Sequence, residues 1–279
     1  MKLEHFENLQ LYYQTVKDYL LQQEALHCLM LGLCSSESLL EQPYLAVATQ
    51  DRSICVAAIR TPPYQLILSK SRSKAAIEAI SSDIVTKNIS LPGVISLKSE
   101  AATFAKLWQS LTRQSYRLDM AQRIYQLEIV NPINYVAGYL RLATENDRSL
   151  LVSWIKAFEI EAIGKQRSEQ HYQDWYDLRM SKNSLYVWHN KLPVSMAGFS
   201  GATPNGIRVN AVYTPSECRT QGYATSCVAA LSQTLLDQEN KYCFLFTNLA
   251  NPIANNIYQK IGYQPVCEVD SYSFENQHE

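Results

Sequence analysis

The segment 207–225, IRVNAVYTPSECRTQGYAT, places a glycine and a cation between a predicted strand and a predicted helix. Gly222 and the small Ala224 let the backbone approach a bulky ligand closely. The first N–H groups of that helix have no partners inside the helix, and the helix dipole adds to their attraction for an anion. Arg219 adds a guanidinium that can bind a phosphate in a bidentate manner. The pattern indicates a phosphate or pyrophosphate site, and a plain strand–turn–helix accounts for it equally well.

A second segment, 248–263, places a phenol on a short predicted helix. Asn251 is a good N-cap, and Pro252 follows at the first helical position, where its missing N–H costs nothing. Asn255 and Tyr258 are three residues apart and therefore neighbours on the helix surface. Tyr258 either serves a ligand or packs as an amphipathic side chain at the edge of the helix.

The elements that must position these two segments alternate between strands and helices. From residue 138 onward, the hydrophobic pattern predicts the order β-α-α-β-β-β-α-β-α-β. The predicted ranges are a strand and a helix within 138–162, a helix at 169–180, strands at 185–189, 193–199 and 207–214, a helix at 223–237, a strand at 242–247, a helix at 252–261 and a strand at 263–274. This order is typical of a mixed α/β fold with helices packed on a sheet.

Residues 1–130 contain elements of the same kinds, but no segment with the Arg-x-x-Gly-x-Ala pattern. Helices are predicted at 3–20, 24–33, 73–85 and 99–113, and strands at 44–49, 53–60, 64–69, 91–96 and 125–130. The turn-rich stretch 131–138 separates the two halves. We therefore expect two domains, 1–135 and 136–279.

Composition limits the class of protein. Of the 279 residues, 47% are hydrophobic and 18% are charged, which excludes a largely disordered chain. The net charge of −1 gives no expectation of nucleic-acid binding. The chain has no run of about 18 apolar residues and no apolar signal segment. Its seven cysteines are scattered, so we expect reduced thiols and no metal site. Taken with the missing apolar run, this predicts a cytoplasmic protein with no membrane partner.

Together, the two segments resemble the GNAT superfamily of N-acyltransferases, which use acyl-coenzyme A. Arg219, Gly222 and Ala224 match the fixed positions of the family's loop motif, Gln/Arg-x-x-Gly-x-Gly/Ala. Asn251 and Tyr258 follow in an Asn-x-x-Ala-x-x-x-Tyr pattern, in the order and spacing of the family. The resemblance implies an α/β fold of two GNAT-like domains, each a mixed sheet flanked by helices. It extends over roughly the second half of the chain, so only that half is expected to bind coenzyme A.

The resemblance implies acetyl-CoA as cosubstrate, a primary amine that attacks the thioester directly, and no metal. The alternative is a non-catalytic module that binds or senses acyl-CoA. The identity of the acceptor, the length of the acyl chain and the choice between monomer and homodimer stay open.

The resemblance also assigns roles to individual residues. Backbone groups of Val212, Tyr213 and Thr214 bind the pantetheine arm. Beside Arg219, consecutive N–H groups cradle the pyrophosphate, namely those of Thr220, Gln221, Gly222, Tyr223, Ala224 and Thr225. Asn251 and Asn255 contact the pantetheine or the nucleotide. Tyr258 is the general acid that protonates the departing thiolate.

The general base is not indicated by the motifs. Many relatives have a Glu on the strand before the loop, whereas 207–210 reads Ile-Arg-Val-Asn here. The candidates elsewhere are Glu159, Glu161, His171 and Asp174, each of which is otherwise a solvated side chain on a helix. A water chain or an already neutral amine is the other option.

Three further features allow two interpretations each. Arg208 either attracts an acidic acceptor or is an ordinary surface arginine. The aromatic clusters Tyr172-Trp175-Tyr176 and Tyr186-Trp188 either wall the acceptor pocket or pack in the core, and core packing is favoured for the Trp residues. The basic stretch around Arg72 is interpreted as a solvated loop rather than a nucleic-acid site.

Overall fold

The computed structural model describes residues 1–35, 42–164 and 166–275 of the chain. The chain divides into two compact units, and neither is continuous in sequence. Unit 1 comprises Met1–Ile124, Asn248–Ala250 and Val266–Glu279, and unit 2 comprises Tyr125–Thr247 and Asn251–Pro265. The division into functional domains at residue 135 stays a prediction.

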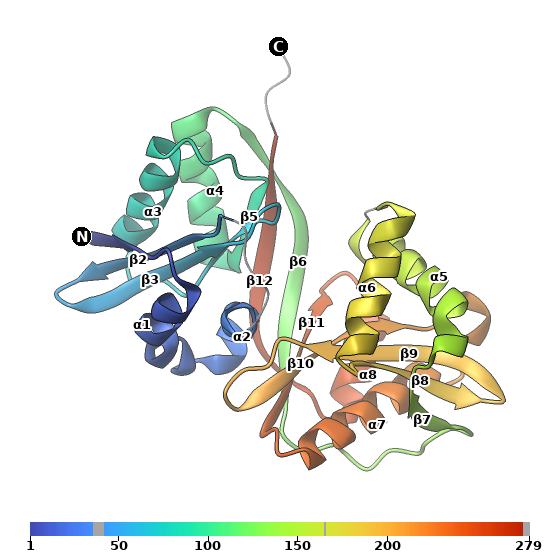
Figure 1. The fold of residues 1–279 in the computed structure, drawn as a ribbon. Helices are drawn as coiled ribbons and strands as arrows, with labels where there is room; N and C mark the ends of the chain where they lie inside the picture. Colours follow the sequence, from blue (N-terminus) through green and yellow to red (C-terminus); the bar gives the residue numbers. More distant parts are fainter. Residues whose placement is uncertain (36–41, 165, 276–279) are drawn as a thin grey trace. The chain divides into compact units, whose positions relative to one another are not determined.

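Unit 1 is a mixed sheet between two pairs of helices (Figure 1). Its elements are β1 (Lys2–His5), α1 (Leu9–Leu21), α2 (Glu24–Cys34), β2 (Tyr44–Gln50), β3 (Ser53–Arg60), β4 (Leu66–Leu68), α3 (Lys74–Thr86), β5 (Gly93–Leu97), α4 (Lys98–Thr112), most of β6 (Ser115–Leu127) and most of β12 (Gln264–Glu275). The strand order is β1-β2-β3-β4-β5-β12-β6. Helices α1 and α2 bury one hydrophobic cluster against the sheet, and α3 and α4 bury another on its opposite face.

Two predictions for unit 1 need correction. The helix expected at 3–20 is wrong at its start, because Lys2–His5 is a strand that pairs with β2. The helix begins only after Asn8. The side chain of Asn8 caps it by accepting hydrogen bonds from backbone N–H groups of the first helical turn. Strand β6 begins at Ser115, well before residue 125. Its early part has no clear apolar alternation, so its pairing with distant strands defines it.

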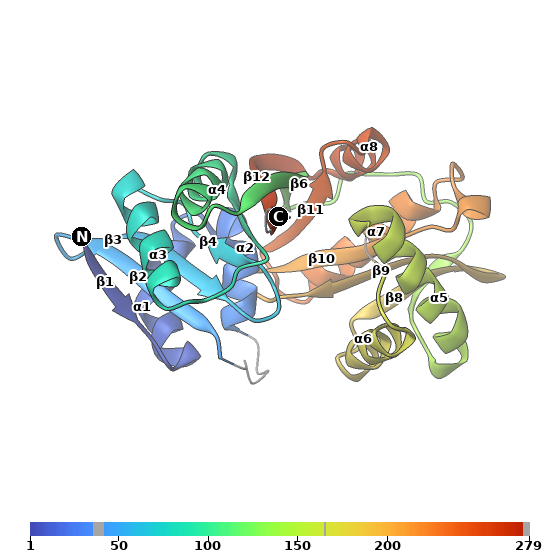
Figure 2. The same ribbon diagram turned by 90° about the horizontal axis from the view of Figure 1, so that it is seen from above.

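Unit 2 has the order of strands and helices that the sequence predicts from residue 138 onward. Its elements are β7 (Tyr139–Leu142), the 3-10 turn η1 (Glu145–Asp147), α5 (Arg148–Phe158), the π-helical turn η2 (Glu159–Ile163), α6 (Glu169–Ser181), β8 (Leu185–Asn190), β9 (Leu192–Ser200), β10 (Gly206–Tyr213), the 3-10 turn η3 (Ser216–Cys218), α7 (Tyr223–Asp237), β11 (Tyr242–Asn248) and α8 (Pro252–Ile261). The strand order is β6-β11-β10-β9-β8-β7. Helices α7 and α8 cover one face of this sheet and α5 and α6 the other (Figure 2).

The two units repeat one succession of strands and α-helices. In the first half of the chain it is β1-α1-α2-β2-β3-β4-α3-β5-α4-β6. In the second half it is β7-α5-α6-β8-β9-β10-α7-β11-α8-β12, and most of its last strand belongs to unit 1. Each repeat contains a parallel pair of strands, β4 with β5 and β10 with β11. Helices α3 and α4 are therefore the counterparts of α7 and α8. The predicted class, two α/β domains with helices on a mixed sheet, is confirmed.

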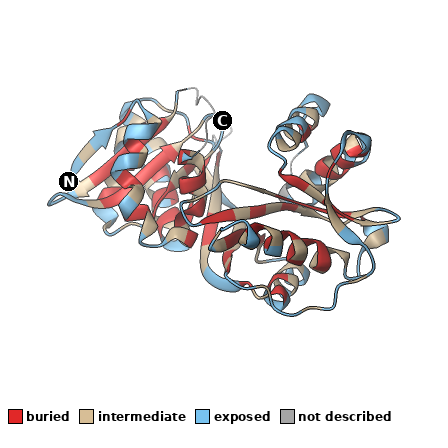
Figure 3. Ribbon diagram, turned by 60° about the horizontal axis from the view of Figure 1, so that its bottom comes forward, coloured by how far each residue is buried: buried red, intermediate tan, exposed pale blue. Residues whose placement is uncertain are grey.

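Buried residues line the sheets and the inner faces of the helices (Figure 3). Within the described ranges, no helix has the length and apolar character to cross a bilayer. The same ranges contain no cluster of three or more His, Cys, Asp or Glu side chains suited to holding a metal ion.

Candidate active site

Strands β10 and β11 run in parallel and then separate. Their pairing covers Gly206–Arg208 against Tyr242–Phe244, and no pairing between these two strands is present beyond it in the described chain. A bulge follows in β10, where Ala211 has a φ of 52° and the register with β9 shifts. The last residues of β10 thus have backbone groups that β11 does not satisfy, and such groups can bind an extended ligand.

The loop 214–222 leads from β10 to α7 and ends on Gly222, which has a φ of 82° at the N-cap of the helix. A Cβ on Gly222 would lie 2.9 Å from Val136 Cγ1, so both the conformation and the space favour glycine. Among the described residues, no side chain caps α7. Residues 219–222 are exposed, so protein atoms do not plug the loop.

Amide groups gather where this loop meets the helix. The first bond inside α7 is donated by Ser226 N–H to Gly222 O, at 3.0 Å. The N–H groups of the first helical residues, Tyr223–Thr225, therefore have no partner in the helix. Together with the helix dipole, they form a site that favours an anion.

Tyr258 lies on α8, the helix after β11. It is 8% exposed, and its ring packs near the rings of Tyr125 and Tyr263. Its hydroxyl has no hydrogen-bond partner among the described residues. Burial raises the pKa of the phenol to about 12, so it stays protonated at neutral pH.

The two segments singled out from the sequence lie on one face of the sheet. Helices α7 and α8 belong to a single hydrophobic cluster, in which Cys227 and Tyr258 are buried and Tyr223 is partly buried. Each helix follows one of the two parallel strands that separate. The amide-rich loop and the phenol therefore flank the place where the strands part.

Comparison with known proteins agrees with this geometry. The family model described as FR47-like protein matches residues 190–271. A GNAT-family acetyltransferase from Colwellia psychrerythraea has a similar structure, with a TM-score of 0.56 and 14% identity over 99% of this chain and 100% of that one. A tandem GNAT protein from the clavulanic acid biosynthesis pathway has a TM-score of 0.57 and 10% identity, with both chains covered completely at 100%. The chain has the GNAT fold.

A further GNAT structure, a GCN5-related N-acetyltransferase from Sphaerobacter thermophilus, has a TM-score of 0.59 and 12% identity over 88% of this chain and 84% of that one. No curated protein sequence matches the chain. The family resemblance and the tandem arrangement expected from the sequence are confirmed at the level of the fold.

In this GNAT fold, Arg219 contacts protein groups. Its Nε donates to Thr214 O at 2.9 Å, and its Nη2 pairs with Glu161 Oε2 at 2.6 Å. The hydrogen bond that Arg219 donates to Glu161 is the main cause that raises the pKa of the guanidinium. Tyr213 joins the group, because its hydroxyl donates to Glu161 Oε1 at 3.3 Å. Both partners of the ion pair are about half exposed, so water screens the pair and a ligand anion can compete for Arg219.

The two asparagines predicted to contact the GNAT ligand hold α8 in place. Asn251 is the N-cap, and its Oδ1 accepts from Ala254 N–H at 3.0 Å, as the sequence indicates. Asn255 Oδ1 accepts from Tyr125 OH at 3.0 Å, and its Nδ2 donates to Asn251 O at 2.7 Å. The sequence gives no signal for Tyr125, which is brought to α8 by the end of β6.

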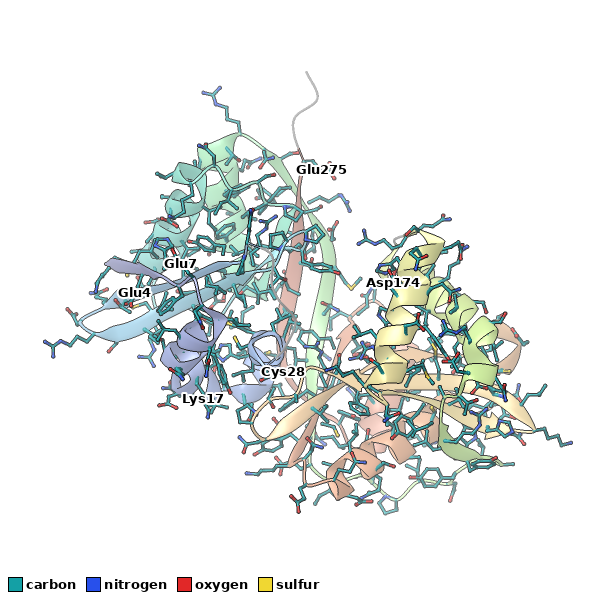
Figure 4. The ribbon with its side chains drawn as sticks, viewed as in Figure 1. Glu4, Glu7, Lys17, Cys28, Asp174 and Glu275 are labelled. Carbon is teal, nitrogen blue, oxygen red and sulfur yellow. The ribbon has the colours of Figure 1, made fainter. Side chains whose placement is uncertain are left out.

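The four candidate bases have different surroundings. His171 Nε2 lies 3.1 Å from Glu159 Oε1, and these side chains are 34% and 12% exposed. Glu161 pairs with Arg219 instead. Asp174 is exposed on α6, where Gln170 donates to it (Figure 4). The structure thus joins two of the four, Glu159 and His171, in one partly buried pair.

Two further residues of unit 2 carry no sequence motif. The buried Ser195 on β9 donates to Tyr213 O at 3.2 Å and lies 2.8 Å from Thr214 Oγ1, which fixes the start of the loop. Arg179 on α6 lies on the opposite face of the sheet from α7. Both depend on contacts between distant segments, which no local pattern records.

Proposed function

We propose that the chain is an acyl-CoA-dependent N-acyltransferase that transfers an acetyl group from acetyl-CoA to a primary amine in unit 2. The observation that supports this most is the separation of β10 and β11 beyond Arg208 and Phe244. One strand is followed by a helix whose first amides have no partner within the helix, and the other by a helix with a buried phenol.

The residues present fit the cosubstrate. The glycine conformation at 222 and the unpaired N–H groups at the start of α7 suit a pyrophosphate. In this proposal, the N–H groups of residues 220–225 cradle it, and Arg219 exchanges Glu161 for a phosphate oxygen. Backbone groups of residues 212–214 bind the pantetheine arm, and Asn251 and Asn255 line its path. Acetyl-CoA supplies the acyl group as a thioester.

Direct attack needs few chemical groups from the protein. The nitrogen of the amine bonds to the thioester carbon, the C–S bond breaks, and the nitrogen loses a proton. The main contribution of the chain is to hold both reactants in line, with a β10 N–H donating to the oxyanion.

Tyr258 acts on the leaving group. Its pKa of about 12 lies above the ordinary thiol value of about 8.5. The phenol therefore stabilises the departing thiolate as a hydrogen-bond donor, and full proton transfer depends on the proton that the amine releases. A hydroxyl with no hydrogen-bond partner in the described part of the chain is suited to this role.

The proton acceptor is less constrained. Strand β10 has no carboxylate at 207–210, so a neutral amine needs only water at this step. Of the four acidic or basic candidates, the Glu159–His171 pair is the one arranged as a base with a positioning partner.

Isothermal titration with acetyl-CoA tests the proposal. We expect one molecule to bind per chain, and competition by coenzyme A. A folded sample that binds neither compound would contradict it.

The missing carboxylate on β10 favours a second candidate, a non-catalytic module that binds acyl-CoA. A panel of primary amines, assayed for thiol release from acetyl-CoA, separates the two candidates. Binding without release for any amine would favour the module, whereas release with at least one would favour the enzyme. The hydroxyl of Tyr258, which has no partner among the residues that the structure describes, supports the enzyme, since pure binding needs no donor at the sulfur.

A further inference from the structure

A pair of arginines lies on the face of the unit 2 sheet that α5 and α6 cover. On β10, Ile207 and Val209 pack in the cluster of α7 and α8, so the alternate residues Arg208 and Asn210 point to the opposite face. Arg208 is also the last β10 residue paired with β11 before the strands separate. Its guanidinium is 5.9 Å from the centre of the Phe246 ring on β11.

Arg179 reaches the same face from α6. Its guanidinium lies 4.4 Å from the centre of the Trp175 ring, and its Nη1 donates to Phe199 O on β9 at 2.6 Å. Burial and, to a smaller extent, the positive charge of Arg208 lower the pKa of Arg179 to about 10. The two cations are therefore close enough to repel one another.

The surroundings of Arg179 differ from those of other arginines in unit 2. Arg148 stacks on Tyr176 at 4.7 Å, yet it also pairs with the carboxylates of Glu145 and Asp177. Within the described chain, no carboxylate lies within ion-pair distance of Arg179; its partners are a carbonyl and an aromatic ring. A desolvated cation without a counter-ion is costly, and a bound anion would offset that cost.

We propose that the acceptor amine also carries a carboxylate, and that Arg179 binds this carboxylate, with the charge of Arg208 adding to the attraction. The inference rests on the proposed function and names its acceptor class, the amino carboxylic acids. The guanidinium is planar and held by Trp175, so it presents its free N–H groups in a fixed plane that suits bidentate binding. Arg208 lies at the point where β10 and β11 part, so the carboxylate would be bound on the opposite side of the sheet from α7 and α8.

The test compares matched acceptors. Amino acids and 4-aminobutyrate are assayed against their carboxamides, with thiol release from acetyl-CoA as the readout. We expect at least one acid to have a kcat/KM about tenfold or more above its carboxamide, the effect of one charged hydrogen-bonding contact. In Arg179→Gln, we expect this ratio to fall toward one. Carboxamides that match or exceed their acids, or a preference that survives in the variant, would overturn the proposal.

Two variants control for structure. Arg148→Gln removes a stacked guanidinium that already has carboxylate partners, and it should keep the preference for acids. Arg179→Lys keeps the charge but loses the planar stacking, and it should keep part of the preference. Loss of the preference in Arg148→Gln as well would overturn the assignment to Arg179.

A binding readout keeps the inference separate from the proposed function. The same acids are titrated calorimetrically into the wild type and Arg179→Gln, each saturated with coenzyme A. We expect weaker binding to the variant; acids that bind neither protein, or both equally, would overturn the proposal even if no amine is acetylated. Failure of acetyl-CoA itself to bind would instead contradict the proposed function.

Discussion

In unit 1, the loop 69–73 lies between β4 and α3, the position that the loop 214–222 occupies between β10 and α7 of unit 2. The loop of unit 1 already has an anion from the protein. Ser71 N–H donates to Glu100 Oε1 at 3.1 Å, and Ser99 Oγ donates to the other oxygen of this carboxylate. Glu100 is 7% exposed, so the carboxylate is largely shielded from water.

The helices after the parallel strands differ at matching positions. Glu100 is the third residue of α4, and the third residue of α8 is Ala254. Phe104 is the seventh residue of α4, and the seventh residue of α8 is Tyr258. Unit 1 thus has its own anion in the loop and no phenol at the seventh position of α4. Unit 2 has amides without a partner in the helix at its loop and a phenol at the matching position of α8. The same scaffold carries a candidate site in one repeat and packing in the other, because a few side chains differ.

The largest effect is expected from Gly222→Val. A β-branched side chain resists a φ of 82°, and its Cβ would meet Val136 at 2.9 Å, so the loop must move away from the pyrophosphate. Loss of two charged hydrogen bonds would weaken acetyl-CoA binding by about 100-fold, as measured by calorimetry. Ser73→Ala, at the matching N-cap of α3, is the control and should leave affinity unchanged. Equal affinities in all three proteins would mean that the loop is not the binding site.

Tyr258→Phe tests the second difference. It makes α8 resemble α4 at the seventh position and removes a hydroxyl that has no partner in the described chain. We expect kcat to fall by about 30-fold or more, with acetyl-CoA affinity and thermal stability nearly unchanged.

The control for Tyr258→Phe is Tyr263→Phe. The hydroxyl of Tyr263 lies 2.8 Å from Ser232 Oγ in the core. This variant should lose about 1 kcal/mol of stability and keep its kcat. A normal kcat in Tyr258→Phe would exclude the phenol from the reaction.

Glu100→Ala tests whether the carboxylate of Glu100 keeps acetyl-CoA from binding to unit 1. The substitution leaves a Ser71 N–H without its acceptor and should reduce the free energy of unfolding by about 1–3 kcal/mol in urea titrations. We still expect one acetyl-CoA per chain, because the loop 69–73 also has no glycine and α4 has no phenol at its seventh position. Glu78→Ala, which removes an exposed partner of Lys74, should change stability by less than about 0.5 kcal/mol. Two bound molecules in Glu100→Ala would show that this carboxylate alone prevents unit 1 from binding acetyl-CoA.

The smallest effect is expected from Glu161→Gln. It removes the partner of Arg219, which an incoming phosphate must otherwise displace. An exposed ion pair contributes at most about 1 kcal/mol, so acetyl-CoA should bind up to about fivefold more tightly. Glu217→Gln removes a nearby exposed charge that does not pair with Arg219 and should have a smaller effect. Weaker binding in Glu161→Gln would mean that Glu161 positions Arg219 for the ligand.

Much of unit 2 can be predicted from the sequence because its signals are local. The range of α7 matches the prediction at both ends, and Asn251, Pro252 and Gly262 fix both ends of α8 through capping chemistry. The bulge at Ala211 cannot be predicted in this way, because it depends on the pairing of β10 with β9.

The sequence also does not predict which charged side chains pair with each other. The family resemblance predicts that Arg219 binds a ligand. Its ion pair with Glu161 cannot be predicted, because it joins segments far apart in the chain. The stacked position of Arg179 and the carboxylate of Glu100 in the loop of unit 1 are of the same kind. Local patterns record helix ends and turns, but not which side chain neutralises which.

The last strand has a consequence for how the chain is made. Residues Val269–Ser273 of β12 pair with Gly93–Leu97 and thereby complete the sheet of unit 1. A ribosome makes the N-terminal part first. The sheet of nascent unit 1 therefore stays incomplete, with the edge of β5 uncovered, until β12 has been translated. Such an edge can pair with other chains, so premature termination would release an aggregation-prone product rather than a usable half.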